Sequence, residues 1–375
     1  MLPVERIHAA LNHKEADRVP FTDNLWTTTI ERWRKEGLPP RVAPEDYFEF
    51  EIAQFGPDTS FMLPKVIIDE TDEYIIFTDD SGATLKNWKH ATSTPELIDF
   101  HLTTRERWAE LKGNLVFKKR RIKWKDDRPR LKKAHKKGLF TTFSTGIGYD
   151  RFSTIMGPMT LLPALLTDPD WITEIFSAHF KLVLECAEEM FGMGYDFDGA
   201  YVFDDLGYKN GPFFSTALYR ELLQPYHRRL CDFFHARGLK VILHSCGNVR
   251  AHIPALIEAG FDCLQPLEVK AGMDLLELKK EYGDVLTFMG GIDVRKMSHP
   301  DPAVIEDEIR EKVTFAKKGG GYIYHSDHSV PDDVSLDRFR RIRELVLQYG
   351  SYSSPQGSSS SKIEQMIKFT PEHTD

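Results

Sequence analysis

Cysteine is scarce in this sequence, with four residues among 375, which is too few for a disulfide scaffold. None of the four has a partner at CxxC spacing. Cys186, Cys231 and Cys263 lie in apolar helical or strand-like patterns, so we expect them to fill a core. We therefore expect a reducing, cytoplasmic compartment. Cys246 is the one cysteine for which we expect a chemical role.

Long hydrophobic runs and fixed-period repeats are also lacking. Apolar stretches such as Leu161–Leu166 are too short to span a bilayer, and the N-terminal residues, charged from Glu5 onward, do not resemble a signal peptide. The formal charge of −8 and the pI near 6.0 argue against bulk nucleic-acid binding. Gly319–Gly321 precedes a strand-like run instead of a helix, which is the wrong order for a nucleotide loop.

What the sequence does contain is an alternation of short β-type runs with longer helical patterns. The β-type runs are Arg18–Asp23, Thr59–Leu63, Leu139–Thr145, Gly199–Asp205, Lys240–Cys246, Asp262–Leu267, Val285–Gly291 and Gly321–Ser326. The clearest helical patterns are Asp170–Phe191, Ala217–Arg237, Ala251–Ala259, Pro302–Lys317 and Leu336–Tyr349, with Asp301 and Ser335 as start signals. Eight strands alternating with helices predict an α/β fold of the (β/α)8 TIM-barrel type, and a doubly wound sheet is the alternative.

Three segments differ from this alternation. Residues 64–92 predict an inserted β-hairpin, with Glu73–Asp79 and Thr84–Trp88 as its arms. Residues 112–137 hold thirteen Lys or Arg against two Asp and predict a basic insertion, either a solvated face or a docking surface for an acidic partner. Residues 351–375 begin with a serine-rich, linker-like stretch. We thus expect one barrel domain over residues 1–350, followed by a flexible tail.

Polar residues gather where the predicted strands end, and in a (β/α)8 barrel this rim holds the active site. The residues at these ends are Asp23, Asn24, Asp204, Asp205, His244, Cys246, Glu268, Asp293, His325, Asp327 and His328. Any one such aspartate has a simple structural explanation, because strand-end Asp residues often cap the next helix. Their convergence on one rim favours a functional site.

His244 and Cys246 form the sharpest element of this rim. Alternate residues of a strand point the same way, so an imidazole and a thiol share one face, a suitable pair for tetrahedral Zn²⁺. We expect the third ligand to be His328, with Asp327 as the second choice. The alternative is a strand-end histidine beside an inert buried cysteine.

These residues carry a family resemblance. The stretch HSCGNVRAHIPALIEAGFDCLQPLE, followed by YGDVLTFMGGID and GGGYIYHSDHSVPDDVS, resembles the uroporphyrinogen decarboxylase superfamily, which includes corrinoid-dependent methyltransferases. The earlier RIHAALNHKEADRVPF and DGAYVFDDLGYKNGPFFSTALYRELLQPY resemble it too, so the match covers most of residues 1–350. The resemblance implies a distorted (β/α)8 barrel.

Two activities compete within that superfamily. The decarboxylase branch carries an arginine-rich stretch near its N-terminus, where this sequence has FTDNLWTTT at residues 21–29. The methyltransferase branch carries an H-x-C motif, which His244 and Cys246 match, and completes its zinc site with a cysteine where this sequence has His328. The resemblance therefore favours methyl transfer between a small methoxy, methylamine or thiol compound and a corrinoid.

In this interpretation each rim residue has an expected role. Zinc would be held by His244, Cys246 and His328, and the corrinoid would be a substrate or would arrive on a partner protein that docks at residues 112–137. The catalytic group would orient ligands or move protons, and comprises Asp204, Asp205, Glu268 and Asp293. The substrate-binding group comprises Asn24, Trp26, Tyr201 and Asn248.

Two further hypotheses remain open. One is a cofactor-free uroporphyrinogen decarboxylase in which Asp23 or Asp204 stabilises a protonated pyrrole. The other is a non-catalytic corrinoid- or ligand-binding protein. The sequence leaves the oligomeric state undetermined, and it predicts neither nucleic-acid nor membrane partners.

Overall fold

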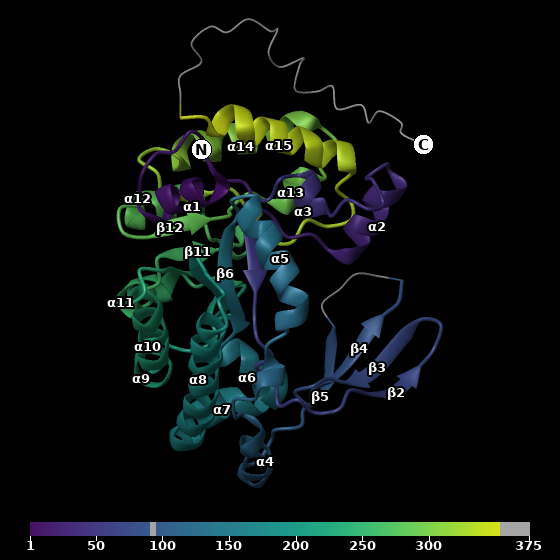
Figure 1. Cartoon of the computed structure of the whole chain (residues 1–375), viewed down its shortest axis with the longest axis vertical. Coiled ribbons are helices and arrows are strands. Elements are labelled where there is room, and N and C mark those ends of the chain that lie inside the picture. Colours follow the sequence, from purple (N-terminus) through teal and green to yellow (C-terminus); the bar gives the residue numbers. More distant parts are fainter. Residues whose placement is uncertain (91–94, 353–375) are drawn as a thin grey trace, which may run out of the picture.

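A parallel sheet of seven strands forms the centre of the computed structural model, which describes residues 1–90 and 95–352 (Figure 1). Its strands follow one another in chain order, and each pairs in parallel with the next. They are β1 (Ile52–Phe55), β6 (Phe140–Gly146), β7 (Gly199–Phe203), β10 (Lys240–His244), β11 (Cys263–Gln265), β12 (Thr287–Met289) and β13 (Tyr322–Ile323). Because the strand order never reverses, the doubly wound alternative is wrong.

The segment around Phe21 joins the two edge strands of this sheet. Phe21 bridges Tyr324 in parallel, next to β13, and its carbonyl accepts a hydrogen bond of 3.2 Å from the amide of Glu51, next to β1. The predicted run Arg18–Asp23 thus occupies the eighth position of the ring through isolated bridges, without forming a regular strand.

Helices lie between the strands and cover the outside of the sheet (Figure 1). They are α1 (Pro3–Leu11), α2 (Thr27–Lys35), α3 (Pro44–Tyr47), α4 (Arg105–Leu111), α5 (Trp124–Lys136), α6 (Gly148–Met156), α7 (Pro158–Thr167), α8 (Pro169–Gly192), α9 (Thr216–Leu222), α10 (Gln224–His235), α11 (Ile253–Ala259), α12 (Leu275–Tyr282), α13 (Val294–Met297), α14 (Pro302–Ala316) and α15 (Leu336–Gly350). Short 3-10 turns cover Lys112–Asn114, Lys119–Arg121, Arg250–His252 and Val269–Ala271. A small two-stranded ribbon pairs β8 (Gly207–Tyr208) with β9 (Gly211–Pro212).

The predicted helix starts are confirmed at two places. The side chains of Asp301 and Ser335 accept backbone hydrogen bonds from the first turns of α14 and α15. One continuous helix over Ala217–Arg237 is wrong, because the chain forms α9 and α10 on either side of Leu223. Pro225 follows at once, and it has no N–H group to continue the first helix.

The second predicted strand, Thr59–Leu63, is also wrong. Those residues form no strand, and the strand of this unit is β1, a few residues earlier. The local backbone bends instead, since Met62 has a positive φ of 54° and the Asp58 carboxylate accepts the Ser60 amide. The buried Arg121 side chain then binds the carbonyls of Asp58 and Ser60 at 2.7 and 2.9 Å, which fixes this bend.

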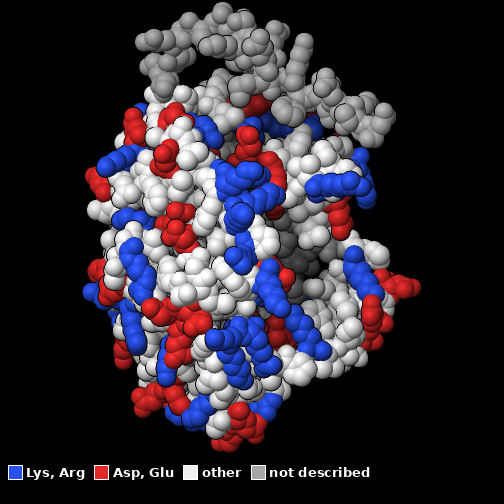
Figure 2. Space-filling view, in the orientation of Figure 1, with Lys and Arg blue, Asp and Glu red and all other residues white. Residues whose placement is uncertain are grey.

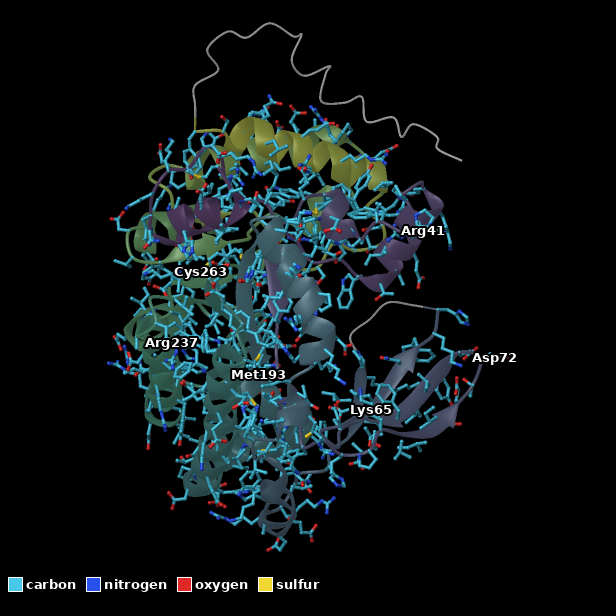
Figure 3. The ribbon with its side chains drawn as sticks, in the orientation of Figure 1. Arg41, Lys65, Asp72, Met193, Arg237 and Cys263 are labelled. Atoms are coloured by element: carbon cyan, nitrogen blue, oxygen red, sulfur yellow. The ribbon has the colours of Figure 1, made fainter. Side chains whose placement is uncertain are left out.

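Both arms of the predicted hairpin are present, within a larger antiparallel sheet. Its strands, in order, are β2 (Val66–Glu70), β3 (Tyr74–Thr78), β4 (Thr84–Trp88) and β5 (Glu96–Asp99), and β3 and β4 are the predicted arms. No residue of these four strands is buried. The sheet projects from the barrel, with Lys65 near its base and Asp72 at its outer tip (Figure 3).

The basic segment over residues 112–137 ends in α5, which precedes β6 and packs on it. Eleven of its thirteen Lys and Arg side chains are exposed, whereas Arg121 is fully buried. Lys133 and Lys137 both bind the Asp46 carboxylate, at 2.5 Å each. The segment is therefore a charged outer face that also anchors neighbouring elements.

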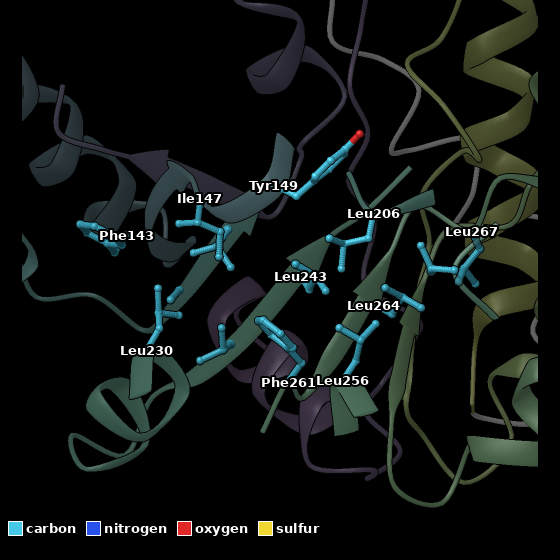
Figure 4. Close-up of a cluster of buried hydrophobic side chains, with 14 of the residues drawn as sticks. Phe143, Ile147, Tyr149, Leu206, Leu230, Leu243, Leu256, Phe261, Leu264 and Leu267 are labelled. Carbon is cyan, nitrogen blue, oxygen red and sulfur yellow. The ribbon is translucent and has the colours of Figure 1, made fainter. Parts of the chain in front are cut away.

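The core lies between the sheet and the surrounding helices. Figure 4 shows this packing, in which Leu243 and Leu264 of neighbouring strands meet Leu256 and Phe261. Among the described residues, no helix combines the length and apolarity that crossing a membrane requires. The serine-rich tail from residue 353 onward lies outside the described residues.

Candidate metal and substrate site

His244 ends β10, and the following turn brings Cys246 back against it. The Nε2 atom of His244 lies 3.4 Å from the Cys246 Sγ atom. Gly247 allows this turn because its φ is +78° and a Cβ there would lie 2.2 Å from the carbonyl oxygen of Gly207. The H-x-C pattern thus places a nitrogen and a sulfur donor next to each other.

Asp205, directly after β7, supplies a third donor atom. Its Oδ1 accepts a 2.7 Å hydrogen bond from the Cys246 amide and lies 3.4 Å from His244 Nε2. Within the described residues, Asp205, His244 and Cys246 form the group whose donor atoms all lie within 4.8 Å of one another. One imidazole, one thiol and one carboxylate are a donor set that suits zinc.

The orientation of His244 is fixed from behind by Gln265, a fully buried residue that ends β11. The His244 Nδ1 atom lies 2.5 Å from the Gln265 Oε1 atom. Because an amide oxygen only accepts, Nδ1 carries the proton and Nε2 keeps its lone pair toward Cys246 and Asp205. This is how ligating histidines are commonly held in metal sites.

The charges around Cys246 favour a cation. Burial raises the pKa of the Cys246 thiol, and the negative charges of Asp205 and Glu268 raise it further. Glu268 is nearly buried, and the closest cation that it meets is Lys270, at 3.9 Å. In the described part of the chain no Lys or Arg forms an ion pair with Asp205 beside this thiol, and a divalent ion would supply positive charge there.

His328, the predicted third ligand, lies outside this group of three. Its ring stacks on Trp26, with 5.8 Å between the ring centroids, and burial followed by the charge of Lys270 lowers its pKa. Asp327, the second choice, accepts the amides of Val269 and Val294 at 3.0 and 2.9 Å. The structure thus places Asp205, which we predicted as a catalytic residue, within ligand distance.

Two predicted catalytic residues make contacts of a structural kind. Asp204 is fully buried, accepts the Asp150 amide at the start of α6 and lies 3.0 Å from His227 Nε2. Asp293 caps α13 and forms an ion pair of 2.6 Å with Arg295.

The predicted substrate-binding residue Asn248 also contacts backbone. Its Oδ1 accepts the amide of Arg250, and its Nδ2 donates to the carbonyl of Ala271, at 3.1 and 2.9 Å. Asp204, Asp293 and Asn248 therefore hold the loops around the rim.

Asp150 is a candidate site residue that the sequence did not indicate. Burial, followed by the charges of Asp205 and Asp204, raises its pKa well above the usual value, and its charge also acts on Cys246. It lies in the first turn of α6, just after β6, so its position after a strand was the available signal.

A cavity of about 1070 Å³ opens beside this cluster and contains the other predicted substrate-binding residues. Asn24, Trp26 and Tyr201 line it, together with Asp23 and His325. Gln265 connects the metal group with the cavity, since it binds His244 and its Nε2 lies 3.3 Å from Nε2 of His325 on the cavity wall. On the face drawn in Figure 2 the surface is hollowed beside the four-stranded sheet, and Lys and Arg side chains gather around the hollow.

Comparison with known proteins supports the resemblance. A sequence model of the uroporphyrinogen decarboxylase (URO-D) family matches residues 144–349, more than half of the chain. The chain belongs to this family. The matched residues include β7, β10, β11, β12 and β13, and with them all three members of the candidate metal group. No curated protein is significantly similar to the sequence.

One solved structure has a similar fold over most of this chain. A methyltransferase from Methanosarcina mazei is 14% identical with a TM-score of 0.63, over 93% of this chain and 99% of that one. A Prevotella bryantii endo-beta-mannanase/endo-beta-glucanase is 10% identical with a TM-score of 0.41, over 84% and 52% of the two chains. A Bacteroidetes-affiliated cellulase is 11% identical with a TM-score of 0.41, over 82% and 93%. The first likeness shows that this chain shares its fold with that methyltransferase.

Proposed function

We propose that this member of the URO-D family is a zinc-dependent methyltransferase, which moves a methyl group between a small substrate and a corrinoid. The observation that carries the proposal is the group of Asp205, His244 and Cys246, with its donor atoms within 4.8 Å and its histidine oriented by Gln265. The fold shared with a methyltransferase agrees with it.

Each group of residues at the site would have its own role in this reaction. His244, Cys246 and Asp205 hold the metal, and zinc bound there would supply the positive charge that keeps a thiol ionised or polarises a methoxy or amine substrate. Gln265 orients His244, and Glu268 lies close enough to Cys246 to influence its charge. The adjoining cavity positions the substrate, and a corrinoid would provide the cobalt for the transfer.

The exposed basic face over residues 112–137 is our proposed dock for a corrinoid-carrying partner. Its exposed Lys and Arg side chains support this, because an acidic partner would be attracted to them over a distance.

Uroporphyrinogen decarboxylation fits the cavity less well. A substrate with eight carboxylates needs several free guanidinium groups. Of the arginines that line the cavity, Arg6 and Arg18 both bind Glu51, and Arg130 binds Asp127. Each of them is thus already engaged by a carboxylate of the chain.

Metal analysis of the purified protein tests the proposal. We expect about one zinc per chain, and a His244→Ala variant should lose most of it because one of three ligands is removed. His90→Ala, which changes an exposed histidine in the antiparallel sheet region, is the control and should keep its zinc. A wild type without stoichiometric zinc, or a His244→Ala variant that holds as much, would show that the site is wrong.

The same measurement identifies the third ligand. If Asp205 is the ligand, Asp205→Asn weakens zinc binding at least about tenfold, while His328→Ala leaves the stoichiometry unchanged. The reverse result would return His328 to the ligand set that the sequence predicted.

A further inference from the structure

Among the helices of the described residues, α7 is the one without a charged side chain. Its inward face packs on α6 and α8. Its outward face is apolar as well, since Met159 is 87% exposed and Leu166 is 73% exposed, more than any other large apolar side chain of the described residues. A helix that is apolar on all sides is normally buried. The outward face of α7 therefore indicates a binding surface.

The exposed apolar side chains of α7 form a single stripe. Met159, Pro163 and Leu166 follow one another at intervals of four and three residues, which places them on one face of the helix. Pro163 is exposed like the other two, and Leu162, half-buried, lies along the edge of the stripe. One partner surface can therefore contact all of these side chains at the same time.

The spacing of this stripe is complementary to itself. If two copies of α7 lie antiparallel about a two-fold axis between positions 162 and 163, Met159 of each copy meets Leu166 of the other. In the same arrangement Leu162 meets Pro163, so the pairs along the stripe are all apolar. Such a contact uses the same patch on both copies and closes as a dimer. The antiparallel orientation also aligns the two helix dipoles favourably.

The charges at the two ends of α7 fit this orientation. At the C-terminal end, Asp168 follows the helix and pairs with Arg105, whose side chain is half exposed. At the N-terminal end, the ring of Phe100 lies against Gly157. Asp99 beside it is exposed, binds the amide of Phe100 and forms no ion pair with a described residue. An antiparallel second copy brings its Arg105 to the end that carries Asp99, whereas parallel packing would bring the two Asp99 carboxylates together.

The edge strand β2 is a competing apolar surface. Val66, Ile67 and Ile68 are all exposed, and Ile67 is 61% exposed. The register of β2 shifts between Ile67 and Asp69, however, which marks a β-bulge in this edge strand. Bulges of this kind hinder the pairing of an edge with a strand of another chain. The stripe on α7 has no comparable interruption and no charge, so it is the better interface.

We propose that two copies of this chain associate through α7, antiparallel and about a two-fold axis, with Met159 of each copy packed against Leu166 of the other. Because α7 packs on α6, whose first turn holds Asp150 at the carboxyl ends of the strands, the contact lies on the same side of the barrel as the candidate site (Figure 1). The association requires neither zinc nor a corrinoid, so it is independent of the proposed function.

Sedimentation velocity of the full chain tests the association. At about 100 µM we expect a dimer that dissociates on dilution, because one pair of helices forms a small interface. Met159→Lys and Leu166→Glu should each raise the dissociation constant at least about tenfold, since each places a charge against an apolar side chain. Both side chains are largely exposed in the single chain, so the variants keep their fold. A wild type that stays monomeric at about 100 µM would overturn the inference.

An equimolar mixture of the two variants tests the antiparallel pairing. The lysine of Met159→Lys then faces the glutamate of Leu166→Glu, and the second contact of the same dimer keeps the native pair. The mixture should therefore dimerise about as strongly as the wild type, although each variant alone does not. Ile67→Lys, which changes a similarly exposed apolar residue of β2, is the matched control and should leave the dimer unchanged. A mixture that stays monomeric, or a dimer lost in Ile67→Lys and retained in both α7 variants, would contradict the proposal.

Discussion

Gln265 illustrates how much one buried side chain contributes at the scale of single residues. Its amide oxygen receives the His244 Nδ1–H, and its amide nitrogen lies 3.3 Å from His325. The residue is fully buried, and within the metal group its side chain binds the Nδ1 atom of His244, on the ring side away from Cys246 and Asp205. In the proposed zinc site it would be a positioning residue, because it would act on the metal only through the histidine.

Replacing Gln265 with leucine should weaken zinc binding by about 10- to 100-fold, the usual effect of removing the group that orients a ligating histidine. Gln265→Glu should retain most of the affinity, since a carboxylate accepts the same proton. Competition with a chromogenic chelator measures both values. Gln224→Leu, which removes another nearly buried glutamine that binds the Ala255 carbonyl, is the control. If it weakens zinc binding as much as Gln265→Leu does, the effect is one of general stability.

At this scale the sequence identified some residues of the site and missed others, for physical reasons. His244 and Cys246 were accessible because a two-residue spacing at the end of a strand places two side chains together. The roles of Asp205 and His328 could not be predicted in this way, because they depend on how two loops fold over the rim. Gln265 gave no signal at all, because a glutamine between apolar residues and a proline has no sequence pattern of its own.

At the scale of elements, the start of α6 is fitted closely to the end of β7. Gly148 has a φ of +59°, and a Cβ atom there would lie 2.1 Å from Oδ2 of Asp204. The Asp204 carboxylate in turn accepts the amide of Asp150 in the first turn of the helix, at 2.7 Å. Because Gly148 has no side chain, the Asp204 carboxylate can lie against this turn and bind the amide of Asp150.

Gly148→Ala should therefore destabilise the protein by about 3 kcal/mol, from the left-handed backbone and the collision with Asp204 together. Gly146→Ala, two residues earlier, is the matched control. A Cβ at Gly146 would meet its nearest atom, Cδ of Arg151, at 3.9 Å, so we expect a loss below about 1 kcal/mol. Urea unfolding followed by circular dichroism compares the two. If both variants lost the same free energy of unfolding, the destabilisation would come from any substitution at this strand end and not from the collision with Asp204.

The elements that sequence patterns predicted best are those with long periodic patterns, such as α8, α14 and α15. The second predicted strand, Thr59–Leu63, is wrong although the run is mostly apolar. Its backbone is bent by contacts with Arg121, which lies 61 residues after Ser60. Such a contact across the chain cannot be read from local propensity. The sequence predicts only two of the four strands of the antiparallel sheet. β2 and β5 were missed because no turn signal as clear as that between β3 and β4 marks them.

At the scale of the whole molecule, the ring is closed by contacts between the two ends of the chain. Phe21 stacks on Tyr324 with 4.7 Å between the ring centroids, and the amide of Val19 binds the carbonyl of Gly350 at 2.9 Å. Beside this closure lies Glu51, 1% exposed, whose carboxylate binds Arg6 of α1 and Arg18. One carboxylate thus connects the N-terminal helix, the closing segment and β1.

This arrangement predicts that Glu51→Gln weakens the entire fold and not only its N-terminus. The variant removes the charge that Arg6 and Arg18 share. Arg6 keeps its ion pair of 2.7 Å with the exposed Asp17 carboxylate, so we expect a loss of about 2 kcal/mol in the free energy of unfolding. Because the ring closes through this point, circular dichroism and tryptophan fluorescence should shift together to lower urea concentration. Glu70→Gln, which breaks the exposed pair with Lys89, should cost less than about 1 kcal/mol. Separate transitions for the two probes in Glu51→Gln would show instead that the N-terminal segment unfolds alone, and that the seven-stranded sheet is stable without its closure.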